Sequence, residues 1–317
     1  MRAFWRKGKR EEESGLMLGG KSLGPTPWLV LGGGGLRGLA HVGAWRALQE
    51  AGLRPAGILG TSIGALVGAC IAGGRPVAEL EDEARELKRT DIARVQRRAL
   101  WVNGIRSESL FRGDALEEYL GRMLPPGGWK DLQIRFLANA VELGSGRAEW
   151  FGPGARTDVS LTRAVYASAA LPLFYPPARL PGGVYVDGGV DEALPLRRAV
   201  EMGASSVVAV DAGSGEGSSE VGRMLADGML AIHQRVLSIM AGRRRREAVA
   251  DWTGPPLLYI RPRLDGFGTF DFDAIEYFLA EGARAAREAM GIPPEEHPPI
   301  QTPDPEPFPR LEDETLP

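Results

Sequence analysis

One serine stands in a pattern that is typical of nucleophilic enzymes. The residues from Gly60 to Gly64 fit G-x-S-x-G, with Ser62 at the centre. The apolar run 56–59 predicts a strand before the serine, and the small, apolar residues of 63–72 predict a buried helix after it. A sharp turn between strand and helix exposes a serine hydroxyl, and the glycines prevent clashes there. We therefore interpret Ser62 as a candidate nucleophile.

A run of glycines follows an earlier predicted strand at 28–31 and precedes a predicted helix at 36–51. It extends from Gly32 to Gly35, and Gly38 stands three residues further on. Consecutive glycines let the backbone approach a ligand closely and point its N–H groups into one cavity. The adjoining helix N-terminus adds partial positive charge. Such a loop binds a phosphate group or holds an oxyanion that develops during catalysis.

Nucleotide binding is the alternative that the glycine spacing raises. Gly33, Gly35 and Gly38 fit the dinucleotide pattern G-x-G-x-x-G, which needs an acidic residue about 20 positions later. Residues 58–60, near that place, are Ile, Leu and Gly. A phosphate-binding P-loop also needs Gly-Lys-Ser/Thr, which does not follow. The oxyanion interpretation is therefore favoured.

A nucleophilic serine needs a base, and the three histidines are poorly placed for that role. His41 lies in the helix behind the glycine run, His233 on a predicted amphipathic helix, and His297 in a Pro-rich segment. Asp187 instead ends a predicted strand, which we expect to be parallel and to point toward the edge that carries Ser62. An Asp is a weaker base than His by about 2.6 pKa units, so this role requires a buried carboxyl with a raised pKa. Pairing of Ser62 with His233, as in an α/β-hydrolase, stays the alternative.

The bulk composition is that of an ordinary globular protein. The net charge of −3 gives no basic field for nucleic acid, and Cys70 is the single cysteine, which excludes an intrachain disulfide and a cysteine metal cluster. The basic residues 1–10 lead into Glu11–Glu13 rather than into an apolar stretch, so no signal peptide is predicted. No run approaches the roughly 18 apolar residues of a membrane span. We expect a cytoplasmic protein.

Strand-like and helix-like segments alternate along the chain, which predicts a three-layer α/β/α fold with a mainly parallel central sheet. Residues 1–26 are expected to be a flexible lead-in, 27–292 one domain, and 293–317 a Pro-rich, acidic, disordered tail. The predicted strands are 28–31, 56–59, 133–142, 147–151, 184–186, 206–210 and 257–260. The predicted helices are 36–51, 63–72, 79–99, 114–123, 221–241 and 272–290.

Four blocks, in this order, resemble the bacterial branch of the patatin-like phospholipase family over roughly residues 27–290. The family's G-G-G-x-R-G loop is similar to Gly33–Gly38, and its G-x-S-x-G to Gly60–Gly64. Its S-A-A-x-P segment is similar to Ala167–Pro172, and its D-G-G/A to Asp187–Gly189. The resemblance implies a patatin-like α/β domain.

The same resemblance implies a lipid acyl hydrolase that works through a Ser–Asp dyad, without histidine and without a cofactor or metal. Ser62 would attack the acyl carbonyl, Asp187 would take its proton, and the N–H groups of Gly33, Gly34 and Gly35 would hold the oxyanion. The expected supporting residues are Arg37, Gly38, Gly60, Gly64, Gly188 and Gly189. Arg37 anchors the loop or favours an anionic head group, and both roles stay open. Acyl transfer, thioester hydrolysis and a silent lipid-binding relative also stay open.

Two departures from the family pattern concern loops. Plant-type members often have Asp before the three glycines. Here Gly32 stands in that place, as a glycine does in many bacterial relatives. The segment Val190–Pro195 lacks the Asn and the first Pro of the usual V-x-N-P-x-P. These differences leave the loop geometry and the substrate preference open rather than the chemistry.

Contact with a lipid surface is a further expectation for an enzyme of this kind. The basic run Arg243–Arg246 ends a predicted amphipathic helix and either attracts anionic lipid or is a solvated helix terminus. Aromatic residues of the middle segment belong either to the core or to an acyl pocket: Trp101, Phe111, Trp129, Trp150 and Phe151.

Overall fold

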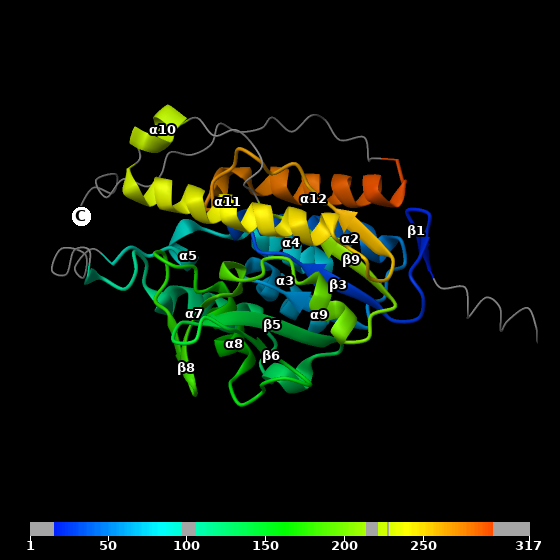
Figure 1. Cartoon of the computed structure of the whole chain (residues 1–317), viewed down its shortest axis with the longest axis horizontal. Coiled ribbons are helices and arrows are strands. Elements are labelled where there is room, and N and C mark those ends of the chain that lie inside the picture. The colour runs from blue at the N-terminus through cyan, green and yellow to red at the C-terminus, as the bar shows by residue number, and fades with distance from the viewer. Residues whose placement is uncertain (1–15, 97–105, 214–220, 227, 294–317) are drawn as a thin grey trace, which may run out of the picture.

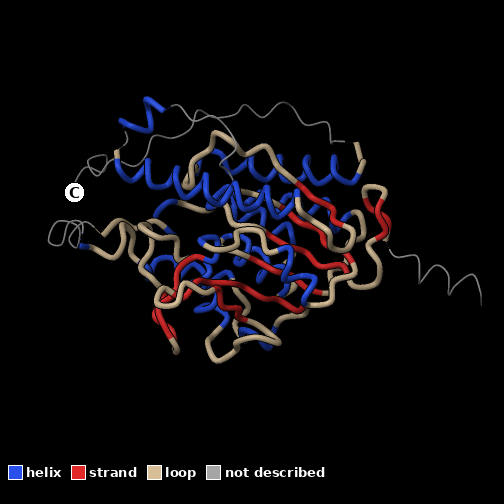
Figure 2. Tube along the Cα trace, in the orientation of Figure 1, coloured by secondary structure: helices blue, strands red, loops and turns tan. Residues whose placement is uncertain are grey.

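The computed structural model of the chain describes residues 16–96, 106–213, 221–226 and 228–293 (Figure 1). A central eight-stranded sheet has the order β10-β9-β3-β4-β5-β8-β7, and β6 pairs with β5. Helices cover the sheet (Figure 2), which confirms the predicted α/β fold. The strands of this sheet are β3 (Pro27–Leu31), β4 (Gly57–Gly60), β5 (Arg135–Glu142), β6 (Ala148–Phe151), β7 (Ala178–Leu180), β8 (Gly183–Asp187), β9 (Ser206–Val210) and β10 (Leu257–Ile260).

The predicted helices occur in their predicted order. No helix within the described ranges is both long and apolar enough to cross a membrane. The α-helices are α2 (Ala40–Glu50), α3 (Ile63–Ala72), α4 (Val77–Glu86), α5 (Arg89–Ile92), α7 (Gly113–Met123), α8 (Leu161–Ala169), α9 (Leu196–Glu201), α10 (Val221–Ala226), α11 (Met229–Ala250) and α12 (Ile275–Met290). Of these, α8 and α9 are additional helices that were not predicted from the sequence. Short 3-10 helices are η1 (Gly35–Leu39), η3 (Gly128–Asp131), η4 (Gly188–Val190) and η5 (Phe272–Ala274).

Strands β3, β4 and β9 are buried along their whole length because helices cover both of their faces. In β3, Leu29 and Leu31 join the larger core, which contains residues of α2, α3, α8 and α12. Trp28 and Val30 point to the other face and pack in a smaller core with α9 and the end of α11. Each side of the sheet therefore has its own apolar core, as three layers require.

The direction of β8 differs from the expectation that the strand before Asp187 is parallel. Strands β10, β9, β3, β4 and β5 are parallel, but β8 runs antiparallel to β5 and pairs Asp187 with Ala140. Strand β5 is longer than β4, whose last residue, Gly60, pairs with Ala138. The end of β8 therefore still reaches the edge of the sheet where β4 gives way to Ser62. Strand polarity does not show in an apolar pattern, so the sequence could not predict it.

Two predicted helices are interrupted. The helix expected at 79–99 ends with α4, because Leu87 has an extended backbone, and α5 follows; residues 97–99 lie outside the described part. The helix expected at 221–241 is divided into α10 and α11. Gly228, with a φ of +84°, precedes α11, and such a backbone suits glycine and ends a right-handed helix.

The folded part begins earlier than the predicted residue 27. Residues 16–26 include two short antiparallel strands, β1 (Met17–Leu18) and β2 (Lys21–Ser22). Leu23 is fully buried, and the Ser206 hydroxyl donates to its carbonyl at 2.6 Å. This part of the expected lead-in is therefore packed on the sheet. The rest of the lead-in, residues 1–15, and the expected tail from 294 onward lie outside the described residues.

Helices α2 and α12 pack with their backbones in close contact. A Cβ on Gly43 of α2 would lie 1.8 Å from the Leu279 carbonyl oxygen, and one on Gly282 of α12 would lie 1.9 Å from the Ala40 carbonyl oxygen. Helix α2 follows the glycine run, and the segment before α12 supplies Thr269, whose carbonyl accepts the Leu36 N–H at 2.9 Å. The helix pair therefore fixes both walls of that loop.

We expect Gly43→Ala to lower the free energy of unfolding by about 2–3 kcal/mol, because the methyl group forces the two helices apart. Urea denaturation measures the change. Gly121→Ala is the matched control in the exposed part of α7, where a Cβ would meet no atom within 4 Å. It should raise stability by about 0.5–1 kcal/mol. Equal effects of the two substitutions would contradict the close packing of α2 on α12.

Candidate active site

Ser62 occupies a strained turn between β4 and α3. Its φ of 57° and ψ of −125° are unusual for a residue with a side chain, and such strain is common at catalytic sites. Glycine is required on both sides: a Cβ on Gly60 would lie 2.4 Å from the Gly64 carbonyl oxygen, and one on Gly64 would lie 2.2 Å from that of Leu31. The turn has the form of a nucleophile elbow.

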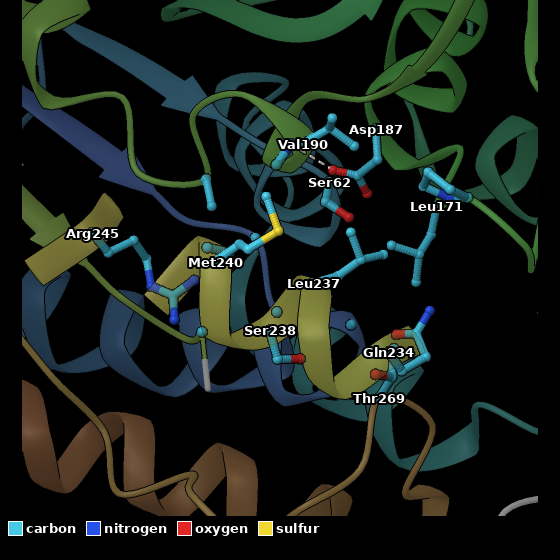
Figure 3. A pocket seen from close by; sticks show the side chains of 18 of the residues that line it. Ser62, Leu171, Asp187, Val190, Gln234, Leu237, Ser238, Met240, Arg245 and Thr269 are labelled. Atoms are coloured by element: carbon cyan, nitrogen blue, oxygen red, sulfur yellow. Dashed lines mark hydrogen bonds between the residues drawn. The ribbon is translucent and has the colours of Figure 1, made fainter. Parts of the chain in front are cut away.

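Asp187 ends β8 and is almost completely buried, with 3% of its surface exposed. Burial raises the pKa of its carboxyl to about 6, although hydrogen bonds from the Ser62 hydroxyl and the Gly189 N–H act to lower this pKa. The Gly189 N–H donates to Asp187 Oδ1 at 2.7 Å. Figure 3 shows the Ser62 hydroxyl and the Asp187 carboxyl pointing toward one another. The structure therefore brings together the two residues that the sequence singled out, in the environment that a carboxylate base needs.

A buried serine links the two candidates. The Ser168 hydroxyl, at the end of α8, accepts the backbone N–H of Ser62 at 2.9 Å. Two residues later, the Ala170 carbonyl accepts the backbone N–H of Asp187 at 3.0 Å. The sequence marks the segment around Ser168 as a family block but predicts no role for this serine. The segment from Ser168 to Ala170 therefore holds the backbones of Ser62 and Asp187 close to each other.

Asn139 is a positioning residue that the sequence did not reveal. It is fully buried in β5, accepts the Thr61 hydroxyl at 2.8 Å, and donates to the Glu192 carbonyl at 3.1 Å. It thereby ties the residue before Ser62 to the loop after Asp187. A single Asn within a strand gives no signal of such a role, because its partners lie about 50 and 80 residues away in the sequence.

The glycine loop lies beside Ser62, but its N–H groups are not equivalent. The N–H of Gly33 donates to the Ala193 carbonyl at 2.9 Å, so it is already engaged and does not match the expected oxyanion donor. Within the described part of the chain, no acceptor is found for the N–H groups of Gly34 and Gly35. Both of these glycines line the same pocket as Ser62.

Arg37 anchors this loop and also lines the pocket that contains Ser62. Its Nε donates to the Gly34 carbonyl at 3.0 Å, and its guanidinium also donates to the Phe267 carbonyl at 2.6 Å. Burial lowers the pKa of Arg37 to about 10, so the side chain keeps its charge at neutral pH. Of the two roles that the sequence left open, the contacts support loop anchoring.

The described histidines do not contact the nucleophile. His41 is fully buried and donates from Nε2 to the Gly32 carbonyl at 2.7 Å, and burial lowers its pKa to about 4. His233 is exposed on α11 and does not line the pocket that contains Ser62. His297 lies outside the described residues. The structure gives the histidine alternative no geometric support.

The pocket above Ser62 has an apolar end and a basic end. Figure 3 shows Leu171 and Leu237 near Ser62, and Arg245 at the other side beyond Met240. Arg245 is buried, with its Nε 3.0 Å from an oxygen of Asp211. Helix α11 forms one wall through Gln234, Leu237, Ser238, Met240, Ala241, Arg244 and Arg245. Among the described residues, no group of three His, Cys, Asp or Glu side chains could hold a metal ion.

The aromatic residues of the middle segment belong to the cores. Phe111 and Phe151 are buried in the larger core. Trp129 is partly buried against the larger core, and Trp150 is partly buried against the smaller one. None of these four lines the pocket, and Trp101 lies outside the described part. The acyl-pocket alternative for the four described aromatics is therefore wrong.

Comparison with known proteins identifies the family of this chain. Residues 29–200 match the family model described as patatin-like phospholipase. The chain belongs to the patatin-like phospholipase family. Ser62 and Asp187 both fall within the matched residues.

Relatives of this patatin-like protein include far longer chains. The present chain is 30% identical to "Lysophospholipase NTE1" of Coccidioides immitis over 86% of its own length. It is 34% identical to an uncharacterized NTE family protein of Mycobacterium tuberculosis over 62% of its own length. It spans 18% of the fungal relative and 51% of the mycobacterial one. Among solved structures, that of VipD from Legionella pneumophila aligns with a TM-score of 0.47 and 15% identity, covering 84% of this chain and 67% of VipD.

We expect Asp187→Asn to stabilise the protein at pH 8 by up to about 3 kcal/mol. The folded-state pKa of about 6 lies above the ordinary value of 3.8, so the ionised carboxylate weakens the folded state above pH 6. This cost disappears as the pH falls below 4, because both states are then protonated. Thermal unfolding at pH 8 and pH 4 measures the difference. Asp191→Asn, at an exposed neighbouring carboxyl, is the control and should change stability by less than about 0.5 kcal/mol. A destabilised Asp187→Asn at pH 8 would contradict the assignment.

Proposed function

We propose that this protein is a lipid acyl hydrolase of the phospholipase A, lysophospholipase or carboxylesterase type. The observation that carries the proposal is the buried Asp187 carboxyl facing Ser62 on its strained turn. The family supports lipid esters as the substrate class, and two of the relatives are named as lysophospholipases. The proposed setting is the cytoplasm, with transient contact at a membrane surface.

The reaction begins with attack of Ser62 Oγ on the acyl carbonyl carbon of the ester. Asp187 accepts the hydroxyl proton as the C–O bond forms, and then gives that proton to the departing alcohol oxygen. The result is an acyl-enzyme at Ser62. Water then attacks the same carbonyl and loses a proton to Asp187. Asp187 returns this proton to Ser62 Oγ as the acyl C–O bond to the serine breaks, which releases the fatty acid and restores both residues.

The negative oxygen of each tetrahedral intermediate lies at the glycine loop in this mechanism. The N–H groups of Gly34 and Gly35 are the proposed donors, and Gly33 serves instead to fix the loop through Ala193. The N-terminus of α3 at Ser62 adds partial positive charge. Because the donors are backbone groups, the side chains that hold them, such as Arg37, are the ones that mutation can remove.

The two ends of the pocket suit the two parts of such a substrate. Leu171 and Leu237 offer apolar surface for the acyl chain beside Ser62. Arg244, which is half exposed, lines the other end and can face a polar or anionic head group, whereas Arg245 beside it pairs with the buried Asp211. The pocket contains no described histidine, which supports a dyad rather than a triad.

Release of fatty acid from a lysophospholipid, and hydrolysis of a soluble short-chain ester, test the proposal. Ser62→Ala should lower kcat/KM at least about 1000-fold on both substrates. Ser238→Ala, which removes another hydroxyl from the same pocket, and His233→Ala should stay within a few-fold of the wild type. The wild-type kcat/KM should rise with pH through about 6, because Asp187 accepts a proton only when it is ionised.

Glu192→Gln is the control for the pH dependence, because burial raises the pKa of that carboxyl to about 7 although it does not line the pocket. This variant should keep the rise near pH 6. Loss of the rise in Glu192→Gln, or dependence of activity on His233, would contradict the dyad. A folded wild type without activity on any ester would favour a silent relative.

A further inference from the structure

Helix α11 is long but contributes little to either core. Of its 22 residues, only Ala231, Gly242 and Arg245 are buried. The side that faces the protein lines the catalytic pocket, through residues such as Leu237 and Ser238. Figure 1 shows α11 lying across the outside of the molecule, in yellow. The opposite side of the helix therefore faces solvent along most of its length.

That solvent-facing side carries a continuous apolar stripe. Met229, Ile232, Val236 and Ile239 follow at helical spacing and have exposures of 81%, 38%, 47% and 45%. Seven of the twelve large apolar side chains exposed in the described part lie within residues 221–240. Single exposed apolar residues need no explanation, but a gathering of this kind marks an interaction surface.

The same face becomes basic toward the end of the helix. Arg243 and Arg246, one and two turns beyond Ile239, are both exposed, and Arg243 pairs with Glu247 at 2.8 Å. Helix α11 contains five arginines and one glutamate, a net charge of +4, although the whole chain carries −3. An apolar stripe followed by arginines matches the chemistry of a bilayer surface, where apolar groups enter the acyl region and arginines meet phosphates.

We propose that this outward face of α11, formed by Met229, Ile232, Val236, Ile239, Arg243 and Arg246, docks the protein on an anionic lipid bilayer. The proposal rests on the proposed lipid hydrolysis, and it names the surface that presents the substrate. The geometry fits, because the other side of the same helix is a wall of the Ser62 pocket. Arg244 ties the helix to the pocket rim by donating to the Val190 and Asp191 carbonyls at 2.7 and 2.8 Å.

A second copy of this chain is the competing occupant, and charge argues against it. A symmetric dimer would place the same patch on both sides of the interface, and so two helices of net charge +4 against each other. Like charges in an interface cost free energy, whereas an anionic bilayer complements them. The bilayer is therefore the occupant that the charge of α11 favours.

Vesicle flotation tests the docking surface. Wild type should bind vesicles of phosphatidylcholine with phosphatidylglycerol, and bind more weakly without the anionic lipid or at high salt. The triple variant Ile232→Ser, Val236→Ser, Ile239→Ser should lose at least about tenfold in partitioning. Arg243→Gln with Arg246→Gln should lose roughly tenfold or more, from about 1 kcal/mol for each arginine. Leu143→Ser with Val200→Ser, at exposed apolar positions elsewhere, is the matched control and should bind as the wild type.

Hydrolysis of a soluble short-chain ester separates this proposal from the proposed function. None of the substituted residues lines the pocket, so all variants should keep wild-type activity on that ester while the α11 variants lose activity on vesicles. An active enzyme whose α11 variants bind vesicles as the wild type does would overturn the docking proposal alone. So would a dimer in light scattering that the triple variant dissociates, without vesicle binding. Absence of hydrolysis of any ester would instead overturn the proposed function.

Discussion

The burial of the Asp187 carboxyl is the constraint on which the rest of the site depends. In water an aspartate is a poor base, because its ordinary pKa of 3.8 lies far below neutral pH. Desolvation raises the value to about 6, and the Ser62 hydroxyl and the Gly189 N–H orient the carboxyl without restoring its full solvation. The buried carboxylate lowers the stability of the folded state. The surrounding elements must therefore hold the Asp187 side chain firmly in place.

That support comes from backbone contacts between segments distant in the sequence. The long strand β5 meets both β4, which leads into Ser62, and β8, which ends in Asp187. Ser168 and Asn139 then fasten the backbone on either side, the first to the N–H of Ser62 and the second to Thr61 and the Glu192 carbonyl. Because the loop after Asp187 is held largely through backbone carbonyls, its departure from the V-x-N-P-x-P pattern leaves these contacts in place.

The sequence predicted those features whose signals are local. The turn at Ser62 and the strand end at Asp187 each show in a few consecutive residues, and the alternation of segments indicates the α/β layers. The polarity of β8, the occupied N–H of Gly33 and the role of Asn139 depend on partners far along the chain, so no short pattern contains them. The amphipathic character of α11 was visible, but which side faces the pocket was not.

Labelling with a fluorophosphonate probe, followed by mass spectrometry, tests the central claim that Asp187 activates Ser62. We predict one adduct, on Ser62, which Asp187→Asn abolishes although that variant stays folded, and which His233→Ala leaves intact. Ser238, in the same pocket, should stay unlabelled. Labelling of another residue, labelling that depends on His233, or full labelling of Asp187→Asn would contradict the account.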